Sequence, residues 1–296
     1  MKKINCYICD LLMMLLVAIS HLPFRVLYAF SDLLYYPLYH VVRYRRKIVR
    51  SNLTTVFPEK SEAEIRSIEK KFYHFFVDIV FECIKMVSIT PDEMKRRMRF
   101  EGMDYVNGLL GQGKSISLYL GHYGNWEWVS SMGLRIGGDV VTAQVYRQLS
   151  NGIMDKLMKR LRERFGHVSV EMRSTARFIN KTVLEKRPSI TGFIADQSPK
   201  KRDAKYYVDF LYHKVPVLTG TERITKHFGH EALFLSMKRI ERGYYVCEVS
   251  SLHPDPSSLP DLELTNLYFR QLEKEIMDAP SMYLWTHNRF KYAMKH

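Results

Sequence analysis

The feature that most constrains the fold is an alternation of short apolar runs with amphipathic stretches, which extends from residue 115 to residue 250. The apolar runs have the length and composition of buried strands, and the stretches between them have helical spacing. This order predicts an α/β fold with a mainly parallel central sheet flanked by helices. The expected strands are 115–120, 140–146, 168–172, 189–195, 205–212, 232–240 and 244–250, and the expected helices are 126–134, 152–165, 174–185, 221–228 and 262–277.

The segment after the first expected strand is the most informative motif. Residues 121–128 read GHYGNWEW, in which two glycines and a helix-starting asparagine mark a strand-to-helix turn. Open α/β sheets tend to place their chemistry at this end of a strand. If His122 lies in the turn, Glu127 in the first helical turn can reach it, fix its tautomer and stabilise its protonated form. We therefore predict that His122 is a general base for a hydroxyl group.

A purely structural interpretation of this motif stays open. Glu127 can simply complement the positive end of a helix dipole, while His122 caps the turn. The surrounding strand, turn and helix favour the catalytic interpretation.

The length and composition predict one large domain with an extension. A chain of 296 residues with 46% apolar residues can bury a substantial core. The segment 61–64 is a capping box that starts a long helix, and Thr90 followed by Pro91 starts another. We expect a helical, membrane-associating extension at residues 1–60 and a single α/β domain at residues 61–296.

The formal net charge of +14 predicts an acidic partner. The 19 tyrosines and 16 phenylalanines favour a membrane interface over DNA. No helix-turn-helix, zinc-finger or RNA-binding signature accompanies the charge, so we expect no nucleic-acid partner.

The amino-terminal segment predicts a shallow or marginal membrane anchor. Its uncharged stretch, 11–24, is shorter than the about 20 residues that span a bilayer, and no signal-peptide cleavage site follows it. The alternative is an amphipathic core helix with a solvated basic end. The cluster that we expect to bind anionic headgroups comprises Arg43, Arg45, Arg46, Lys47 and Arg50.

Two further motifs resemble cofactor sites but lack the required context. Residues 108–115 match the P-loop pattern, yet a helix-like segment precedes them and a strand follows, the reverse of the order that a phosphate site needs. Cys6 and Cys9 form a C-x-x-C pair without a second pair of ligands. We therefore expect no metal and no cofactor, and we interpret Cys6, Cys9, Cys83 and Cys247 as reduced residues.

Taken together, the motifs resemble the late-step lipid A biosynthesis acyltransferases, the lauroyl and myristoyl transferases of the H-x4-D/E lysophospholipid acyltransferase superfamily. The resemblance covers nearly the whole chain. Only the histidine block is specific by itself, and the order and spacing of the other segments add to it. The matching segments are 44–53, 57–59, 121–127, 146–147, 196–197, 215–220 and 285–291.

The resemblance implies a glycerolipid acyltransferase-like fold and transfer of an acyl chain from an acyl carrier protein thioester to a hydroxyl of a lipid A precursor. It places the reaction at the cytoplasmic face of the bacterial inner membrane. By this analogy His122 is the general base, and Glu127 orients and charges it. Direct attack needs no acyl-enzyme, which agrees with the lack of a G-x-S-x-G nucleophile elbow. The basic surface would then meet the carrier protein and an anionic glycolipid acceptor.

The resemblance also implies a set of substrate-binding residues. Arg147 is the candidate for a phosphate or the developing oxyanion, because guanidinium presents a rigid donor fork; a solvated surface arginine is the alternative. Gln148 stands where the family has proline. Asp196 and Gln197 end a buried strand and are interpreted as substrate contacts or as a structural cap. The full set is Asn125, Tyr146, Arg147, Asp196, Gln197 and Arg289.

Two other functions remain open at this level. One is an acyltransferase that uses the same base on another glycolipid or phosphoglycolipid, with acyl-CoA as donor. The other is a non-catalytic, membrane-bound lipid-binding protein that kept the fold. The sequence leaves the acyl chain length and the acceptor hydroxyl undetermined.

Overall fold

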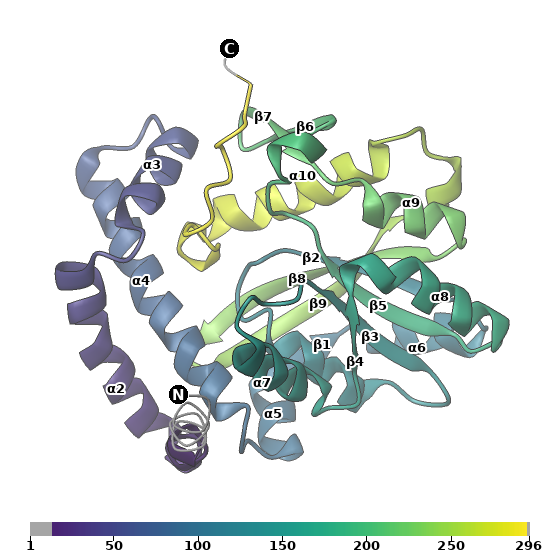
Figure 1. The fold of residues 1–296 in the computed structure, drawn as a ribbon, viewed down its shortest axis with the longest axis horizontal. Helices are drawn as coiled ribbons and strands as arrows, with labels where there is room; N and C mark the ends of the chain where they lie inside the picture. The colour runs from purple at the N-terminus through teal and green to yellow at the C-terminus, as the bar shows by residue number, and fades with distance from the viewer. Residues whose placement is uncertain (1–13, 295–296) are drawn as a thin grey trace, which may run out of the picture.

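The computed structural model describes residues 14–294. At its centre lies a seven-stranded sheet in the order β1-β9-β8-β2-β5-β3-β4 (Figure 1). Within this sheet only β8 and β9 pair antiparallel, so the prediction of a mainly parallel sheet flanked by helices is confirmed. The strands are β1 Met98–Glu101, β2 Ile116–Leu120, β3 Val141–Tyr146, β4 Val168–Glu171, β5 Ser189–Ile194, β8 Glu231–Glu241 and β9 Tyr244–His253.

The helices begin largely where the capping signals predicted. The hydroxyl of Ser61 accepts a hydrogen bond from the Glu64 backbone, and the Glu64 carboxylate accepts one from the Ser61 backbone, which completes the capping box of α4. The side chain of Asn151 caps α7 in a similar way. The α-helices after residue 61 are α4 Glu62–Lys85, α5 Pro91–Arg97, α6 Met103–Gly111, α7 Gly152–Glu163, α8 Thr175–Leu184, α9 Gly220–His227 and α10 Glu263–Asp278.

One expected strand and one expected helix differ from the prediction. The segment 205–212 does not join the central sheet: β6, Tyr206–Phe210, pairs antiparallel with β7, His213–Val217. Leu211 and Tyr212 form the turn with positive φ values of 52° and 65°, a conformation that the sequence hides because neither is glycine or asparagine. The helix expected at 126–134 is a 3₁₀ helix, η2, at Trp128–Arg135.

The amino-terminal part consists of bent helices. These are Met14–His21, α2 at Phe24–Tyr36, the π-helical η1 at Pro37–Val42, and α3 at Arg46–Val56. Among residues 14–294 no single helix is long and apolar enough to cross a membrane. Met14–His21 and Phe24–Val42 would suffice together, but they are bent by 118° where they meet.

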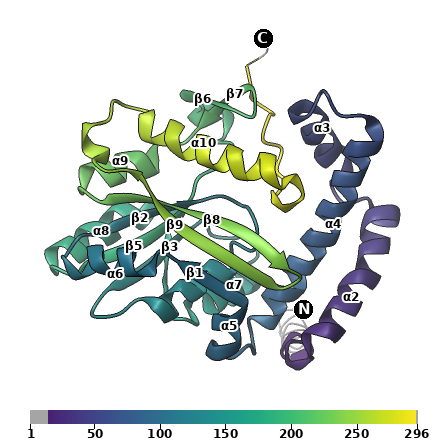
Figure 2. The ribbon, with the colours of Figure 1, turned by 180° about the vertical axis from the view of Figure 1, so that it is seen from behind.

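Polar contacts tie α2 to the rest of the molecule. The buried carboxylate of Asp78, on α4, accepts hydrogen bonds from Ser31 of α2 and from Arg239 and Arg242 of the β8–β9 hairpin. Arg242 also binds Asp32 of α2. Figures 1 and 2 show α2 and α4 side by side along one flank of the sheet. The helices before and after residue 60 therefore contribute to one hydrophobic core.

Part of the basic cluster predicted to bind headgroups has internal partners. Arg46 and Arg50 bind the carboxylate of Glu69, whose side chain is fully buried, at 2.7 and 2.5 Å. Arg45 donates to the backbone carbonyl of Thr286. Because Glu69 already neutralises two of these arginines, fewer charges of the cluster are available to a membrane than the sequence suggested.

The structure also places the P-loop-like segment 108–115 and two of the four cysteines. α6 ends before β2 begins, so the P-loop-like segment has the helix-then-strand order that argued against a phosphate site. Cys83 and Cys247 are free thiols, and Cys6 and Cys9 lie outside the described residues.

Candidate active site

The candidate site lies where three neighbouring strands end. β2, β5 and β3 are adjacent and parallel, so their carboxyl ends meet at one edge of the sheet. His122 follows β2, Asp196 follows β5, and Arg147 directly follows β3. Sheet order therefore brings together residues that are far apart in the sequence.

The imidazole of His122 is paired with Asp196. Its Nδ1 lies 2.7 Å from Oδ1 of Asp196, and the backbone N–H of His122 donates to the same oxygen at 3.3 Å. A carboxylate at Nδ1 favours the tautomer whose other ring nitrogen, Nε2, is a free base. The side-chain amide nitrogen of Gln197 lies 3.3 Å from this Nε2. Since 20% of the His122 side chain is exposed, a substrate hydroxyl can reach it.

The environment keeps Asp196 ionised although it is buried. Burial alone would raise its pKa, but the charge of His122, the hydrogen bond from His122 and the charge of Arg289 together lower it. The carboxylate can therefore stabilise a protonated His122 when the imidazole takes up a proton.

Glu127 has a different partner from the one predicted. Both of its carboxylate oxygens accept hydrogen bonds from Arg162 of α7, at 2.7 and 2.8 Å. The hydrogen bonds of residues 14–294 include none between Glu127 and His122, and Asp196 occupies the expected place. The reason is local: Gly124 has a φ of +62° and η2 begins only at Trp128, so Glu127 lies in the turn and is directed toward α7.

Trp126 connects Glu127 to the histidine indirectly. Its indole nitrogen donates to Oε1 of Glu127 at 3.2 Å. Its ring lies edge-on to the imidazole of His122, with 5.4 Å between the ring centroids. Glu127 thus orients a side chain that packs against His122.

The structure corrects the expected role of Asn125. Asn125 does start the helical segment, since its side-chain oxygen accepts from the backbone N–H of Trp128 at 3.1 Å. Its amide nitrogen donates to Glu82 at 2.6 Å, and the side chain is fully buried. Both polar atoms are used inside the protein, so Asn125 shapes the turn and does not contact substrate.

Sequence reasoning missed Glu82, which lies beneath this turn. Besides Asn125, its carboxylate accepts hydrogen bonds from the hydroxyls of Tyr28 and Tyr245, and its environment contains no cation that pairs with it among residues 14–294. Burial raises the pKa of Glu82 to about 7. An available signal was a carboxylate at helical spacing, three positions after the apolar Ile79.

Arg289 is another predicted site residue with a corrected role. It is 1% exposed, it donates to the Ser198 hydroxyl and the Pro216 carbonyl, and it lies against the rings of Phe210 and Phe269. It therefore supports the loop after β5 from the interior of the protein.

Contacts and exposure define the positions of three other residues near this edge. His287 accepts a hydrogen bond from the Ser198 backbone, and burial lowers its pKa to about 4, so it is neutral at pH 7. Arg147 is exposed beyond the end of β3, with no ion-pair partner among the described residues, and Tyr146 is half-buried at the last position of that strand. Arg147 is thus available to an anion at the same edge as His122.

Comparison with known proteins identifies the family. The family model for bacterial lipid A biosynthesis acyltransferase matches residues 2–292. The lipid A biosynthesis lauroyltransferase of Escherichia coli (strain K12) is 26% identical over 279 residues, which cover 92% of this chain and 88% of that protein. The palmitoleoyltransferase of the same strain is 25% identical over 257 residues, covering 83% and 79%. A lipid A biosynthesis acyltransferase of Haemophilus influenzae is 22% identical over 275 residues, covering 91% and 83%. The chain is an acyltransferase that belongs to the bacterial lipid A biosynthesis acyltransferase family.

Proposed function

We propose that this protein transfers a fatty acyl chain from an acyl carrier protein thioester to a hydroxyl of a lipid A precursor, at the cytoplasmic face of the inner membrane. The observation that carries the chemistry is the pairing of His122 Nδ1 with the buried Asp196, which favours Nε2 as the proton acceptor at the carboxyl ends of the strands. The similar proteins act in lipid A biosynthesis, which supports the acceptor. The donor is inferred from the family resemblance and the basic surface.

In the proposed reaction, Nε2 of His122 takes the proton of the acceptor hydroxyl while its oxygen attacks the thioester carbonyl carbon. The tetrahedral intermediate then collapses: the carbon–sulfur bond breaks, and the thiolate takes the proton from His122. Asp196 holds Nδ1–H and stabilises the transient imidazolium. A positioned base of this kind contributes roughly 10²- to 10⁴-fold to the rate.

We assign Glu127 an indirect part in the same step. The original hypothesis, that Glu127 directly orients and charges His122, is replaced by contact through Trp126. The ion pair with Arg162 fixes Glu127, Glu127 fixes the indole, and the indole restricts the imidazole. A fixed ring keeps Nε2 aimed at the bound hydroxyl.

Two polar groups near His122 are suited to the substrates. The Gln197 amide is close enough to Nε2 to contact the acceptor hydroxyl. Arg147 offers a free guanidinium at the end of the adjacent strand, where it can bind a phosphate of the acceptor or the oxyanion of the intermediate.

An exposed apolar surface supports attachment to a membrane. On α2 and η1 the side chains of Leu33, Val41 and Val42 are 68%, 78% and 66% exposed. Large apolar side chains exposed on two consecutive helical elements indicate an interaction site. We propose that this surface lies in the membrane interface, with the nearby basic residues at the headgroups.

The test of the reaction uses purified full-length protein with acyl carrier protein thioesters and a lipid A precursor. Mass spectrometry should show one added acyl chain with wild type, and a yield at least about 10²-fold lower with His122→Ala. Equal yields would refute the general base. Product from acyl-CoA but not from the carrier protein would favour the alternative donor, and no product from any donor would favour a non-catalytic lipid-binding protein.

The test of membrane attachment uses substitutions, because removing α2 would also remove its contacts with Asp78 and Glu82. Leu33→Glu, Val41→Glu and Val42→Glu together should release the protein from inner-membrane vesicles in a sedimentation assay. The control makes the same change in charge at exposed neutral polar sites, Ser67→Glu, Asn180→Glu and Gln271→Glu. Equal release of the control variant would show that net charge, and not loss of the apolar surface, causes the release.

A further inference from the structure

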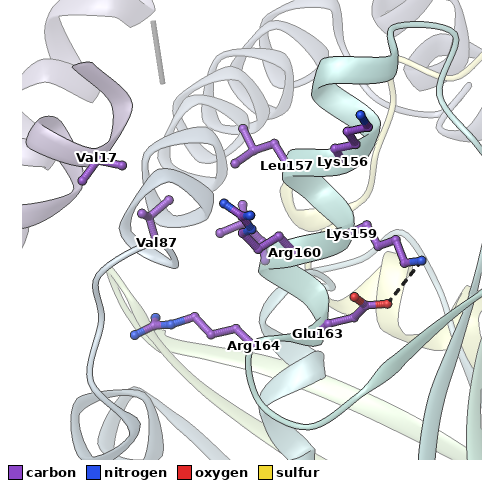
Figure 3. A pocket seen from close by; sticks show the side chains of 9 residues that line it. Val17, Val87, Lys156, Leu157, Lys159, Arg160, Glu163 and Arg164 are labelled. Atoms are coloured by element: carbon purple, nitrogen blue, oxygen red, sulfur yellow. Dashed lines mark ion pairs between the residues drawn. The ribbon is translucent and has the colours of Figure 1, made fainter. Parts of the chain in front are cut away.

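A cleft separate from the candidate active site lies between α7, the helix Met14–His21 that carries Val17, and the turn after α4 that carries Val87 (Figure 3). Its volume is about 680 Å³, which is within the roughly 300–1,000 Å³ typical of sites for small molecules. His122, Glu127 and Asp196 are not among its lining residues.

One wall of the cleft is apolar. Val17 and Val87 form it, and Figure 3 shows the two valines facing α7, which contributes Leu157, across the cleft. Val17 belongs to the same helix as Met14 and Leu15, whose side chains are 62% and 54% exposed. The apolar wall is therefore continuous with an exposed apolar helix surface.

The other wall carries a row of cations. Lys156 and Arg160 of α7 and Arg164 at its carboxyl end are exposed and follow one another at intervals of four. The ion pairs of residues 14–294 give none of the three a carboxylate partner, whereas Lys159 pairs with Glu163 and Arg162 with Glu127. Arg164 also donates one hydrogen bond to the backbone carbonyl of Met86, so Lys156 and Arg160 are the less constrained of the three cations. Like charges at this spacing destabilise a helix. An anion held between them would remove that repulsion.

We propose that this cleft binds an anionic phospholipid of the membrane, with the phosphate on Lys156, Arg160 and Arg164 and an acyl chain along Val17, Val87 and Leu157. An apolar wall opposite a cationic row matches an anionic amphiphile. An acidic protein partner fits less well, because the cleft is concave and the charged groups of such a partner would leave the apolar lining residues without apolar contacts. The bound phospholipid contacts α7, the same helix whose Arg162 binds both carboxylate oxygens of Glu127.

The experiment measures phospholipid binding to detergent-purified full-length protein by native mass spectrometry, with phosphatidylglycerol and phosphatidylcholine of identical chains. Wild type should prefer phosphatidylglycerol by about tenfold or more, the equivalent of a single charge-assisted contact. Lys156→Glu with Arg160→Glu should abolish this preference. Val87→Trp, which fills the apolar wall, should weaken binding of both lipids.

The matched control is Arg173→Glu with Arg177→Glu, which makes the same change in charge at exposed positions of another helical segment. It should leave the preference unchanged. Circular dichroism and thermal unfolding establish that each variant is folded. Both residues of the charge-reversal variant are exposed, so that variant tests the proposal even if Val87→Trp does not fold.

Three results would overturn the proposal: equal binding of the two lipids by wild type, an equal loss in the control variant, or unchanged phosphatidylglycerol binding in the charge-reversal variant. If that variant instead loses binding of apo acyl carrier protein, or has a raised KM for the glycolipid acceptor, while phospholipid binding persists, the cleft belongs to that ligand. The binding readout requires no acyl transfer, so it stands apart from the test of the proposed reaction.

Discussion

Asp196 follows β5 and Glu127 lies in the same turn as His122, and both carboxylates are largely buried. Asp196 accepts a hydrogen bond from the imidazole, whereas Glu127 binds the guanidinium of Arg162 with both oxygens. Histidine gains and loses a proton near neutral pH, but arginine stays charged. Asp196 can therefore respond to proton transfer, while Glu127 is permanently neutralised and stabilises the geometry of the turn.

The largest expected effect is on the kcat of a variant at Asp196, the carboxylate that binds the imidazole. Asp196→Asn should lower kcat by about two to four orders of magnitude, because an amide neither stabilises the imidazolium nor reliably holds Nδ1–H. The measurement is kcat at saturating donor and acceptor, with thermal unfolding as the check on folding. A decrease smaller than that of Glu127→Gln would reverse the roles assigned to the two carboxylates.

The second prediction concerns the Glu127–Arg162 pair. Glu127→Gln should lower the free energy of unfolding by about 3 kcal/mol, since it leaves Arg162 partly buried without a counter-charge. The double variant Glu127→Gln with Arg162→Gln should recover part of this loss. Urea unfolding of wild type, the two single variants Glu127→Gln and Arg162→Gln, and the double variant gives the coupling energy of the pair. Additive losses would show that the pair does not act as a unit.

Glu82 extends the comparison to a buried carboxylate whose hydrogen bonds come from neutral groups alone. Its pKa is raised to about 7 in the folded state by burial, so the folded protein binds this proton more tightly than the unfolded chain does. The resulting stabilisation is fully present below the unfolded-state pKa and is lost as pH rises from about 4.5 through 7. The size of the loss is at most about 3 kcal/mol.

This loss can be measured with Glu82→Gln, which removes the titration. Between pH 5 and pH 8, urea unfolding should show a smaller decrease in stability for the variant than for wild type. Glu275, whose pKa burial raises to about 8, titrates in both proteins and cancels in the difference. Identical pH dependence of the two proteins would mean that Glu82 titrates outside this range.

The smallest effect is expected at a site remote from all three carboxylates. Ser61→Ala removes one hydrogen bond of the α4 capping box and should lower the free energy of unfolding by about 1 kcal/mol. The kcat should not change. A reduced kcat here would mean that loss of stability alone lowers activity, and the effects at Asp196 and Glu127 would need correction for it.

Several elements could be predicted from the sequence because their signals are local. The apolar runs of β2, β3 and β5 and the capping box of α4 each depend on residues within a few positions. The β6–β7 hairpin was missed because Leu211 and Tyr212 adopt positive φ values that their residue types do not announce. The strand at 98–101 was missed because it follows α5 directly, with no turn residue to mark where it begins.

The sequence by itself determined the alternation of strands and helices, the turn that exposes His122, and the family. Only the tertiary structure decided which carboxylate reaches the imidazole. That choice depends on β2 lying parallel and adjacent to β5, which places Asp196 beside His122 across 74 positions of sequence, while a left-handed glycine at 124 turns Glu127 toward α7. Strand order is set by packing of the whole sheet, and no local pattern of residues encodes it.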